Sequence, residues 1–384
     1  MPLPSSVRHI ILSLSNLHSP LLHWFNSHPS PPRFIISDMF CGWTQNLASQ
    51  LGIPRFVFSP SGAFAFSAIC FLWRELPKRE NPNDDNEIVS FQRLPNSPTY
   101  PWWQVSPLFR SYASGDPGSE KFKDWFLGNI ASYGLIVNSF NDFEKPYLDY
   151  LKTELGHDRV WAVGPLLPQD DSSLKQRGGS SSVMVNDVVS WLDEKQDRTV
   201  VYVCFGSQTM LNEDQTVAIA SALDKSGVHF IWSVREAVNV PLEFERGTAN
   251  RGLVIRGWAP QVLILRHRAV GAFLTHCGWN SVLESVVAGV PMLAWPMSAD
   301  QFVNATLLVE ELKVAKRVCE GAKAVPDSDE LSRVLADSVS GRGEEMRMAL
   351  KLQRAALDAV RDGGSSERNL RVLMEQLLFP SGSV

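Results

Sequence analysis

The sequence has few cysteines, and their spacing suggests neither a disulfide framework nor a metal site. Its five cysteines are scattered along the chain and form no CxxC pair. Disulfide-stapled secreted domains and structural zinc sites both require an ordered cysteine spacing, so this pattern argues against both classes. We expect reduced thiols and a cytoplasmic location.

Long apolar runs and an excess of basic residues are also missing. No apolar run reaches the roughly 18 residues that cross a bilayer, so we expect no membrane span. The first residues, MPLPSSVRHIILSLSNL, lack a clear signal-peptide cleavage site, and apolar residues at helical spacing favour an amphipathic helix instead. A net charge of −5 provides no basic field for nucleic acid.

Short apolar segments alternate with helical patterns along the 384 residues, which are enough for two domains. FIIS, RFVFS, LIVNS and VWAVG read as buried parallel strands in the first half. The alternation restarts with TVVYVCFGS and continues through HFIWSVR, LVIRGW, GAFLTHC and PMLAW. The sequence therefore predicts an α/β protein with two Rossmann-like domains, whose strand ends would face a ligand-binding cleft.

Four regions follow from this alternation. Residues 1–165 form the first domain, and the Ser/Gly/Asp-rich stretch 166–186 is a linker. Residues 187–361 form the second domain, and 362–384 carry a last helix that we expect to pack back on the first domain. The segment 77–118, rich in Pro, Asn and Asp, is expected to be irregular.

Two strand-to-helix turns in the second domain carry small and polar residues. One contains Ser207 in FGS, and the other is HCGWNS, with His276, Asn280 and Ser281. Glycine allows close backbone approach and a helix N-terminus favours an anion, so these turns suit a phosphate. The alternative is that Asn280 and Ser281 only cap the helix. Neither GxGxxG nor a P-loop sequence occurs, which weakens dinucleotide and P-loop interpretations.

Four further residues have both a binding and a structural interpretation. Glu284, one turn into the same helix, would accept bonds from a ribose diol or form a capping box with Ser281. Trp258 would stack on a base or pack in the core. Asp300 and Gln301 would bind sugar hydroxyls or cap a helix.

The segment from Trp258 to Gln301 closely resembles the signature box of plant secondary-metabolite UDP-glycosyltransferases, in the flavonol and phenolic branch of glycosyltransferase family 1. WAPQ, HCGWNS, the glutamate of VLES, GVP and the closing DQ are all in register. The resemblance extends to FIISDMFCGWTQNLASQLGIP, to the FGS turn and to the C-terminal helices, and so covers essentially the whole chain.

This resemblance implies a GT-B fold and transfer of a sugar from a UDP-sugar to a small lipophilic phenolic acceptor such as a flavonoid, with inversion and without a metal. The UDP-sugar would be a co-substrate, so no cofactor is expected, and we also expect a monomer. A terminal glutamine such as Gln301 is usually associated with UDP-glucose. The UDP-sugar site would comprise Ser207, Trp258, Ala259, Gln261, His276, Trp279, Asn280, Ser281, Glu284, Asp300 and Gln301. On the acceptor side we expect Ser59, Trp103 and Asn138.

The family's catalytic base is a histidine in a glycine-histidine turn after the first strand, oriented by an aspartate that Asp38 matches. That histidine has no counterpart here, because the chain begins where the family has already passed two to three βα units, about 60–90 residues at about 30 per unit. His9, His18, His23 and His28 lie in helix or loop patterns and are not expected to replace it. We therefore expect an incomplete N-terminal domain.

Three interpretations remain open at this point. The chain is an incomplete version of an active glycosyltransferase, or it is a form that binds UDP-sugar and transfers sugar weakly or not at all. The remote alternative is a nucleotide-dependent oxidoreductase or another α/β binding protein.

Overall fold

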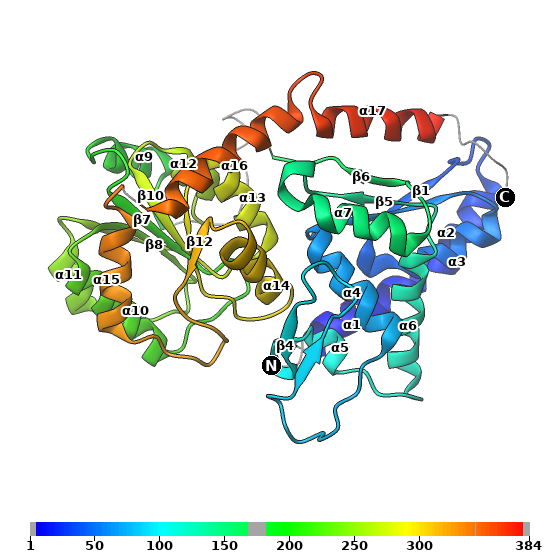
Figure 1. Ribbon diagram of the computed structural model, residues 1–384, viewed down its shortest axis with the longest axis horizontal. Coiled ribbons are helices and arrows are strands. Elements are labelled where there is room, and N and C mark those ends of the chain that lie inside the picture. Colours follow the sequence, from blue (N-terminus) through cyan, green and yellow to red (C-terminus); the bar gives the residue numbers. More distant parts are fainter. Residues whose placement is uncertain (1–4, 168–181, 342, 379–384) are drawn as a thin grey trace. The chain divides into compact units, whose positions relative to one another are not determined.

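The computed structural model describes residues 5–167, 182–341 and 343–378, which fall into two compact units (Figure 1). Unit 1 comprises Met1–Leu166, Ser298–Asp300 and Asp358–Val384, and unit 2 comprises Leu167–Met297 and Gln301–Leu357. Each unit has its own parallel sheet and its own core. Most of the predicted linker, residues 168–181, lies outside the described residues.

The sheet of unit 1 is parallel, with the strand order β1-β2-β5-β6. These strands are β1 (Ile35–Asp38), β2 (Arg55–Ser59), β5 (Gly134–Val137) and β6 (Val160–Ala162). β2, β5 and β6 coincide with three predicted apolar segments and are largely buried, as strands covered by helices are. β1 coincides with the fourth segment, but its predicted burial is wrong, because it is the edge strand and Ile36 is 48% exposed. Phe56, Ile136 and Trp161 form the centre of a buried cluster in this unit.

Helices of unit 1 surround this sheet. They are α1 (Ser5–Leu14), α2 (His18–Ser27), α3 (Thr44–Leu51), α4 (Ala63–Glu75), α5 (Pro107–Arg110), α6 (Pro117–Ile130), α7 (Asn141–Leu155) and α17 (Ser365–Leu378), with single 3-10 turns η1 (Ser15–Leu17), η2 (Met39–Cys41) and η3 (Trp102–Gln104). The stretch 77–118, expected to be irregular, contains the antiparallel pair β3 (Ile88–Ser90) and β4 (Thr99–Pro101) as well as η3 and α5.

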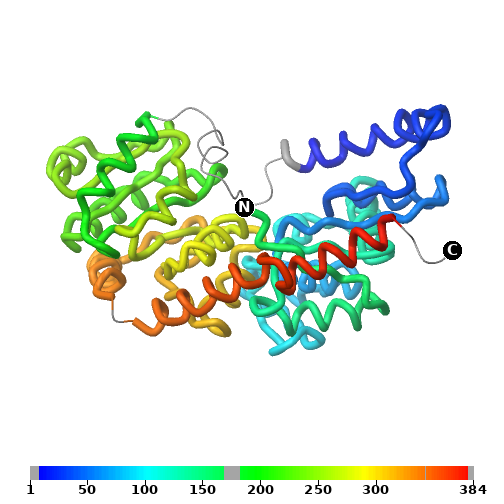
Figure 2. Tube along the Cα trace, turned by 90° about the horizontal axis from the view of Figure 1, so that it is seen from above, coloured from blue at the N-terminus to red at the C-terminus, as the bar shows by residue number. Residues whose placement is uncertain are grey.

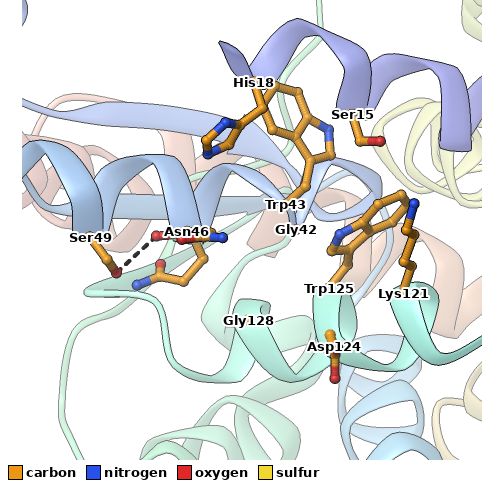
Figure 3. A pocket seen from close by; sticks show the side chains of 11 residues that line it. Ser15, His18, Gly42, Trp43, Asn46, Ser49, Lys121, Asp124, Trp125 and Gly128 are labelled. Atoms are coloured by element: carbon orange, nitrogen blue, oxygen red, sulfur yellow. Dashed lines mark hydrogen bonds between the residues drawn. The ribbon is translucent and has the colours of Figure 1, made fainter. Parts of the chain in front are cut away.

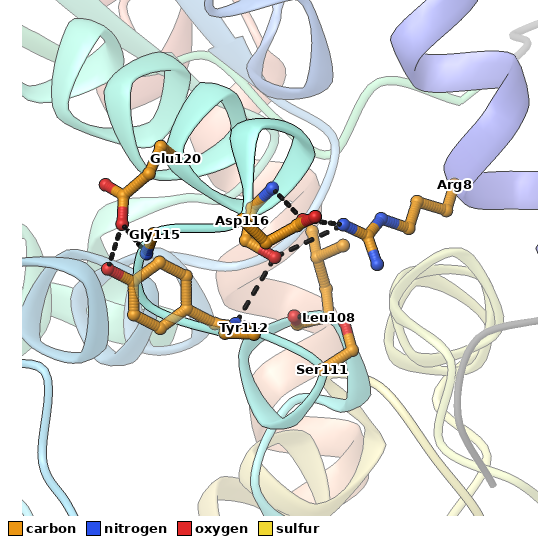
Figure 4. A network of polar contacts seen from close by, with 9 residues as sticks. Arg8, Leu108, Ser111, Tyr112, Gly115, Asp116 and Glu120 are labelled. Atoms are coloured by element: carbon orange, nitrogen blue, oxygen red, sulfur yellow. Dashed lines mark hydrogen bonds and ion pairs between the residues drawn. The ribbon is translucent and has the colours of Figure 1, made fainter.

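Two polar contacts bring distant segments of unit 1 together. Arg8 of α1 donates to Asp116 Oδ2 at 3.0 Å and to Ser119 Oγ at 3.2 Å, and Asp116 also caps α6 (Figure 4). At the other end of the chain, Ser366 donates its hydroxyl to the Gly164 carbonyl at 2.6 Å. Ser366 therefore fixes α17 beside the end of β6.

The sheet of unit 2 is also parallel, with the order β12-β11-β10-β7-β8-β9. Its strands are β7 (Val200–Cys204), β8 (His229–Val234), β9 (Gly252–Arg256), β10 (Val270–Thr275), β11 (Met292–Ala294) and β12 (Ala315–Arg317). All but β12 were predicted. The strand order reverses between β7 and β10, which is where open α/β sheets bind ligands.

Unit 2 carries helices that connect these strands and extend to the C-terminal part of the chain. They are α9 (Val185–Asp193), α10 (Glu213–Ser226), α11 (Leu242–Thr248), α12 (Gln261–Arg266), α13 (Trp279–Ala288), α14 (Gln301–Thr306), the π-turn η4 (Leu307–Glu311), α15 (Ser328–Ser338) and α16 (Glu344–Val360). The tube in Figure 2 shows α16 and α17 as two successive helices near the end of the chain. None of the helices in the described ranges is long and apolar enough to cross a membrane.

Candidate functional site

The two predicted turns of unit 2 meet at the reversal of strand order. Cys204 at the end of β7 is paired in register with Thr275 at the end of β10, so the FGS and HCGWNS turns leave the same edge of the sheet. A Cβ atom on Gly206 would lie 2.7 Å from His276 Nε2, and one on Gly278 would lie 2.6 Å from the same atom. Both distances are too short for a side chain. The imidazole of His276 is therefore held between two glycines, and the two turns can approach it this closely only because neither glycine has a side chain.

His276 is held neutral in this setting. Burial lowers its pKa to about 4, because a desolvated imidazole disfavours the charged form. Its Nδ1 is buried and has no hydrogen-bond partner among the described residues. At neutral pH the ring therefore contributes a hydrogen-bonding group without contributing a charge.

The N-cap residue of α13 is Gly278, which has extended backbone angles, so this helix receives no cap from the side chain of its own N-cap residue. The alternative in which Asn280 and Ser281 only cap this helix is thus wrong, because both lie inside its first turn. Trp279 is buried and Asn280 is exposed. The amide groups and partial positive charge of a helix start favour an anion at this position.

Gln261 forms hydrogen bonds with three residues, of which Glu284 and Ser281 were predicted site residues and Tyr202 was not. Its Nε2 donates to Glu284 Oε2 at 2.7 Å and to Ser281 Oγ at 3.0 Å. The Tyr202 hydroxyl donates to Gln261 Oε1 at 3.2 Å. Glu284 therefore does not form a capping box with Ser281. Tyr202 was missed because it lies inside the apolar run of β7, where its hydroxyl gave no separate signal.

Three other residues were predicted to bind the UDP-sugar: Trp258, Ala259 and Ser207. Trp258 follows β9 and is half-buried, and Ala259 beside it is buried. Ser207 is exposed directly after Gly206. Trp258 is thus neither a core residue nor a free surface residue, which keeps a stacking role open.

Asp300 and Gln301, predicted to act together, belong to different units. The Asp300 carboxylate accepts a hydrogen bond from Ser61 Oγ at 2.5 Å within unit 1. In unit 2, Gln301 Oε1 accepts from the Met297 amide at 2.9 Å, which closes the loop before α14. Neither of these two hydrogen bonds caps the first turn of α14. Their joint role at a sugar remains a prediction.

Asp38 ends β1 in unit 1 and accepts a hydrogen bond from the Phe40 amide at 2.8 Å. Desolvation raises the pKa of Asp38, while the Phe40 amide and the charge of Arg55 act in the opposite direction. Among the described residues, no histidine is a hydrogen-bond partner of this carboxylate.

A buried arginine that the sequence analysis missed supports the turn after Asp38. Arg55 is 1% exposed; its Nε donates to Thr44 Oγ1 at 2.7 Å and its guanidinium donates to Asn129 Oδ1 at 2.9 Å. Asn129 Nδ2 in turn donates to the Met39 carbonyl at 2.7 Å. Arg55 had been read only as the first residue of the apolar strand RFVFS.

The three acceptor-side candidates have mainly internal contacts. Ser59 is fully buried and donates to the Ser61 carbonyl at 3.0 Å. Asn138 Oδ1 accepts from the Leu166 amide at 2.9 Å, which ties the end of β5 to the chain beyond β6. Trp103 lies half-buried in η3. An acceptor-binding role for these residues stays a prediction.

No cluster of three or more His, Cys, Asp or Glu side chains in the described ranges is arranged to hold a metal ion. The candidate site in unit 2 therefore consists of neutral donors, one carboxylate and a helix start.

Comparison with known proteins decides the family. A family model described as UDP-glucoronosyl and UDP-glucosyl transferase matches residues 180–321. Flavonol 3-O-glucosyltransferase UGT89B1 of Arabidopsis thaliana is 56% identical over 374 residues, which cover 96% of this chain and 78% of that protein. The chain belongs to the UDP-glycosyltransferase family. This UDP-glycosyltransferase is also 38% identical to flavonol 7-O-rhamnosyltransferase of the same plant, across 98% of the chain and 80% of that relative.

The fold of this UDP-glycosyltransferase agrees with solved relatives. The crystal structure of Arabidopsis thaliana UGT89C1 complexed with UDP-L-rhamnose matches it with a TM-score of 0.79 and 40% identity, covering 98% of this chain and 80% of that one. The predicted GT-B fold with Rossmann-like units and the predicted class of enzyme, a transferase, are confirmed.

Proposed function

We propose that unit 2 binds the UDP part of a UDP-sugar at the start of α13. The observation that carries this proposal is the position of His276, held neutral between Gly206 and Gly278 at a helix start whose N-cap residue is a glycine. A pyrophosphate placed there accepts hydrogen bonds from the imidazole and from Asn280 and Ser281. The helix dipole and these neutral donors stabilise the charge of the leaving UDP, so the chemistry requires no metal.

We propose the following residues for the ribose, the uracil and the sugar of the donor. Glu284 accepts hydrogen bonds from the ribose hydroxyls, and Gln261, which donates to Glu284, fixes the orientation of that carboxylate. Trp258 stacks on the uracil beside Ala259, and Ser207 and Trp279 complete the surroundings of the phosphates. Asp300 and Gln301 bind the sugar. We propose glucose on the basis of Gln301, although the relatives named above include both a glucosyltransferase and a rhamnosyltransferase.

The acceptor is a small phenolic molecule such as a flavonol, in line with the names of the relatives. Inversion at the anomeric carbon needs a base that removes the proton of the attacking hydroxyl. Asp38 is suited to stabilise the cation of such a base, with Ser59, Trp103 and Asn138 on the acceptor side. Among the described residues, the carboxylate of Asp38 accepts a hydrogen bond from the Phe40 amide, and no histidine there is bonded to it. We therefore propose that this 384-residue chain binds UDP-sugar but transfers the sugar weakly.

Two further expectations complete the proposal. All five cysteines are free, which supports a cytoplasmic location with reduced thiols. We also propose that the chain acts as a monomer, which sedimentation with and without UDP would test.

The decisive experiment has two readouts on the same preparation. Calorimetry measures UDP binding, and product analysis measures transfer from UDP-glucose or UDP-rhamnose to a flavonol. Saturable UDP binding with transfer far below that of a longer relative is the expected result. Absence of UDP binding would contradict the donor-site proposal, and turnover equal to that of the relative would contradict the proposed impairment. Competition between the two sugar nucleotides determines which sugar is preferred.

A further inference from the structure

A cavity of about 430 Å³ lies in the helical layer of unit 1, between α2, α3 and α6 (Figure 3). Small-molecule sites in proteins commonly have volumes of this order. The residues that line it do not include Asp38 or any of the acceptor-side candidates. Figure 3 shows Trp43, with His18 beside it, facing Trp125 and Lys121 of α6.

Three polar atoms of this cavity are buried and have no hydrogen-bond partner in the part of the chain that the structure describes. They are Nε2 of His18, Nε1 of Trp43 and Oε1 of Gln45, and all three residues line the cavity. Trp43 is the most buried of them, with 6% of its surface exposed. Buried polar groups are nearly always hydrogen-bonded, and each unsatisfied one is costly. Three such atoms around one cavity indicate that a bound molecule completes their hydrogen bonds.

The types of these atoms define the molecule. The Trp43 indole can only donate and Gln45 Oε1 can only accept, and a hydroxyl group on a bound molecule can meet either need because it both donates and accepts. The indoles of Trp43 and Trp125 provide flat apolar surfaces that stack on an aromatic ring. Lys121 and Asp124 carry opposite charges on α6, so the lining favours neither an anion nor a cation.

We propose that this cavity is a second binding site of the enzyme, separate from the transfer site, for a small neutral aromatic molecule that carries a hydroxyl group. Arg8 holds α1 against the start of α6 through Asp116 and Ser119, and α1 continues through η1 into α2, so the wall that carries His18 is fixed. The inference stands independently of the transfer reaction, because it depends on residues of the helical layer alone.

The experiment titrates the full 384-residue chain with 4-methylphenol by calorimetry, in the presence of saturating UDP. 4-Methylanisole, which keeps the ring but cannot donate, and 4-hydroxybenzoate, which adds a charge, serve as comparison ligands. We expect saturable binding of 4-methylphenol and binding of the anisole weakened by roughly fivefold or more, since a hydrogen bond is lost. 4-Hydroxybenzoate should also bind more weakly.

Three variants locate the binding. W43F removes the indole donor and S49W places a large ring at the cavity, so each should weaken binding by roughly tenfold. W24F is the matched control, because Trp24 is exposed on α2 and does not line the cavity. Thermal unfolding shows whether each variant is folded. If W43F does not fold, the binding measured with S49W tests the location of the ligand. In ¹⁵N spectra, the indole signal missing from W43F should be the one that 4-methylphenol shifts.

Two results would overturn the proposal. Absence of saturable 4-methylphenol binding would mean that only water fills the cavity. Binding unchanged in both S49W and W43F would place the ligand elsewhere. UDP binding is measured separately in every sample, so a failure here is distinguishable from a failure of the donor site.

Discussion

The start of α4 in unit 1 and the start of α13 in unit 2 have the same local construction and different occupants. Each helix follows a parallel strand, and each has a glycine N-cap with extended backbone angles and no side-chain cap of its own, Gly62 for α4 and Gly278 for α13. At α4 the position of an anion is taken by the buried carboxylate of Glu144, which accepts from the Ala63 amide at 2.9 Å and from the Phe64 amide at 2.8 Å.

At α13 the neighbouring group is the neutral imidazole of His276, and the helix's own carboxylate, Glu284, lies one turn further and is bound by Gln261. A helix start attracts anions wherever it occurs, so we propose that the same feature stabilises the fold in one unit and binds a ligand in the other.

Removal of the internal anion should have the largest effect. Glu144→Ala leaves the Ala63 and Phe64 amides and the Ser139 hydroxyl without the acceptor that they now share. We expect the free energy of unfolding to fall by about 4 kcal/mol, since buried donors become unsatisfied. Urea unfolding measures it. Glu144→Gln, which keeps one acceptor oxygen, should lose less, and equal stability of all three proteins would contradict the role of this carboxylate.

Closure of the open helix start should abolish most nucleotide binding. In Gly278→Ala the new Cβ would meet His276 at 2.6 Å and displace the imidazole. We expect UDP affinity to fall by about a hundredfold, equivalent to about 3 kcal/mol. Gly247→Ala is the matched control, because a Cβ at Gly247 meets nothing within 4 Å. Calorimetry on both variants decides, and an unchanged affinity in Gly278→Ala would argue against a ligand at this turn.

The neutral imidazole should make stability depend on pH. The pKa of His276 is about 4 in the folded chain, below the ordinary 6.5, so between these values only the unfolded chain binds the proton. Stability therefore falls as pH falls from 6.5 towards 4, by up to about 3 kcal/mol, and levels off below that. His276→Gln should flatten this part of the profile. His23→Gln, at an exposed position on α2, should leave it unchanged.

The smallest of these effects concerns the ribose. Glu284→Gln should weaken UDP binding by about tenfold, because a carboxylate acceptor is lost, and should leave binding of inorganic pyrophosphate unchanged. Glu243→Gln, at an exposed position on α11, is the control. Equal losses for both ligands would place Glu284 at the phosphates instead.

The sequence predicted correctly those strands whose apolar residues are required by burial, and it located the turn that belongs to the signature box. The strands from β2 to β11 that form the two parallel sheets were recognisable because apolar β-branched segments follow from coverage by helices. β12, with the sequence AKR, was missed, since a short edge strand needs only partial burial and Lys316 is exposed. The polar pair of α13 was found as a binding turn, although whether Asn280 and Ser281 capped it could not be decided without the structure.

Contacts between residues distant in the sequence could not be predicted. Arg55 and Asn129 are 74 positions apart, and Glu144 caps a helix that begins 81 positions earlier. Asp300 and Gln301 are adjacent in the sequence, yet their side chains bond within different units. Each of these contacts depends on how the sheet places its strand ends, which no local pattern encodes.

The most direct test of an open anion site at α13 is the titration of His276 itself, followed by NMR with His276→Gln to assign its signal. We expect a midpoint near pH 4 in the free chain and a clear rise when UDP saturates the site, because the pyrophosphate charge favours the imidazolium. A midpoint that saturating UDP does not move would contradict the placement of the pyrophosphate beside His276.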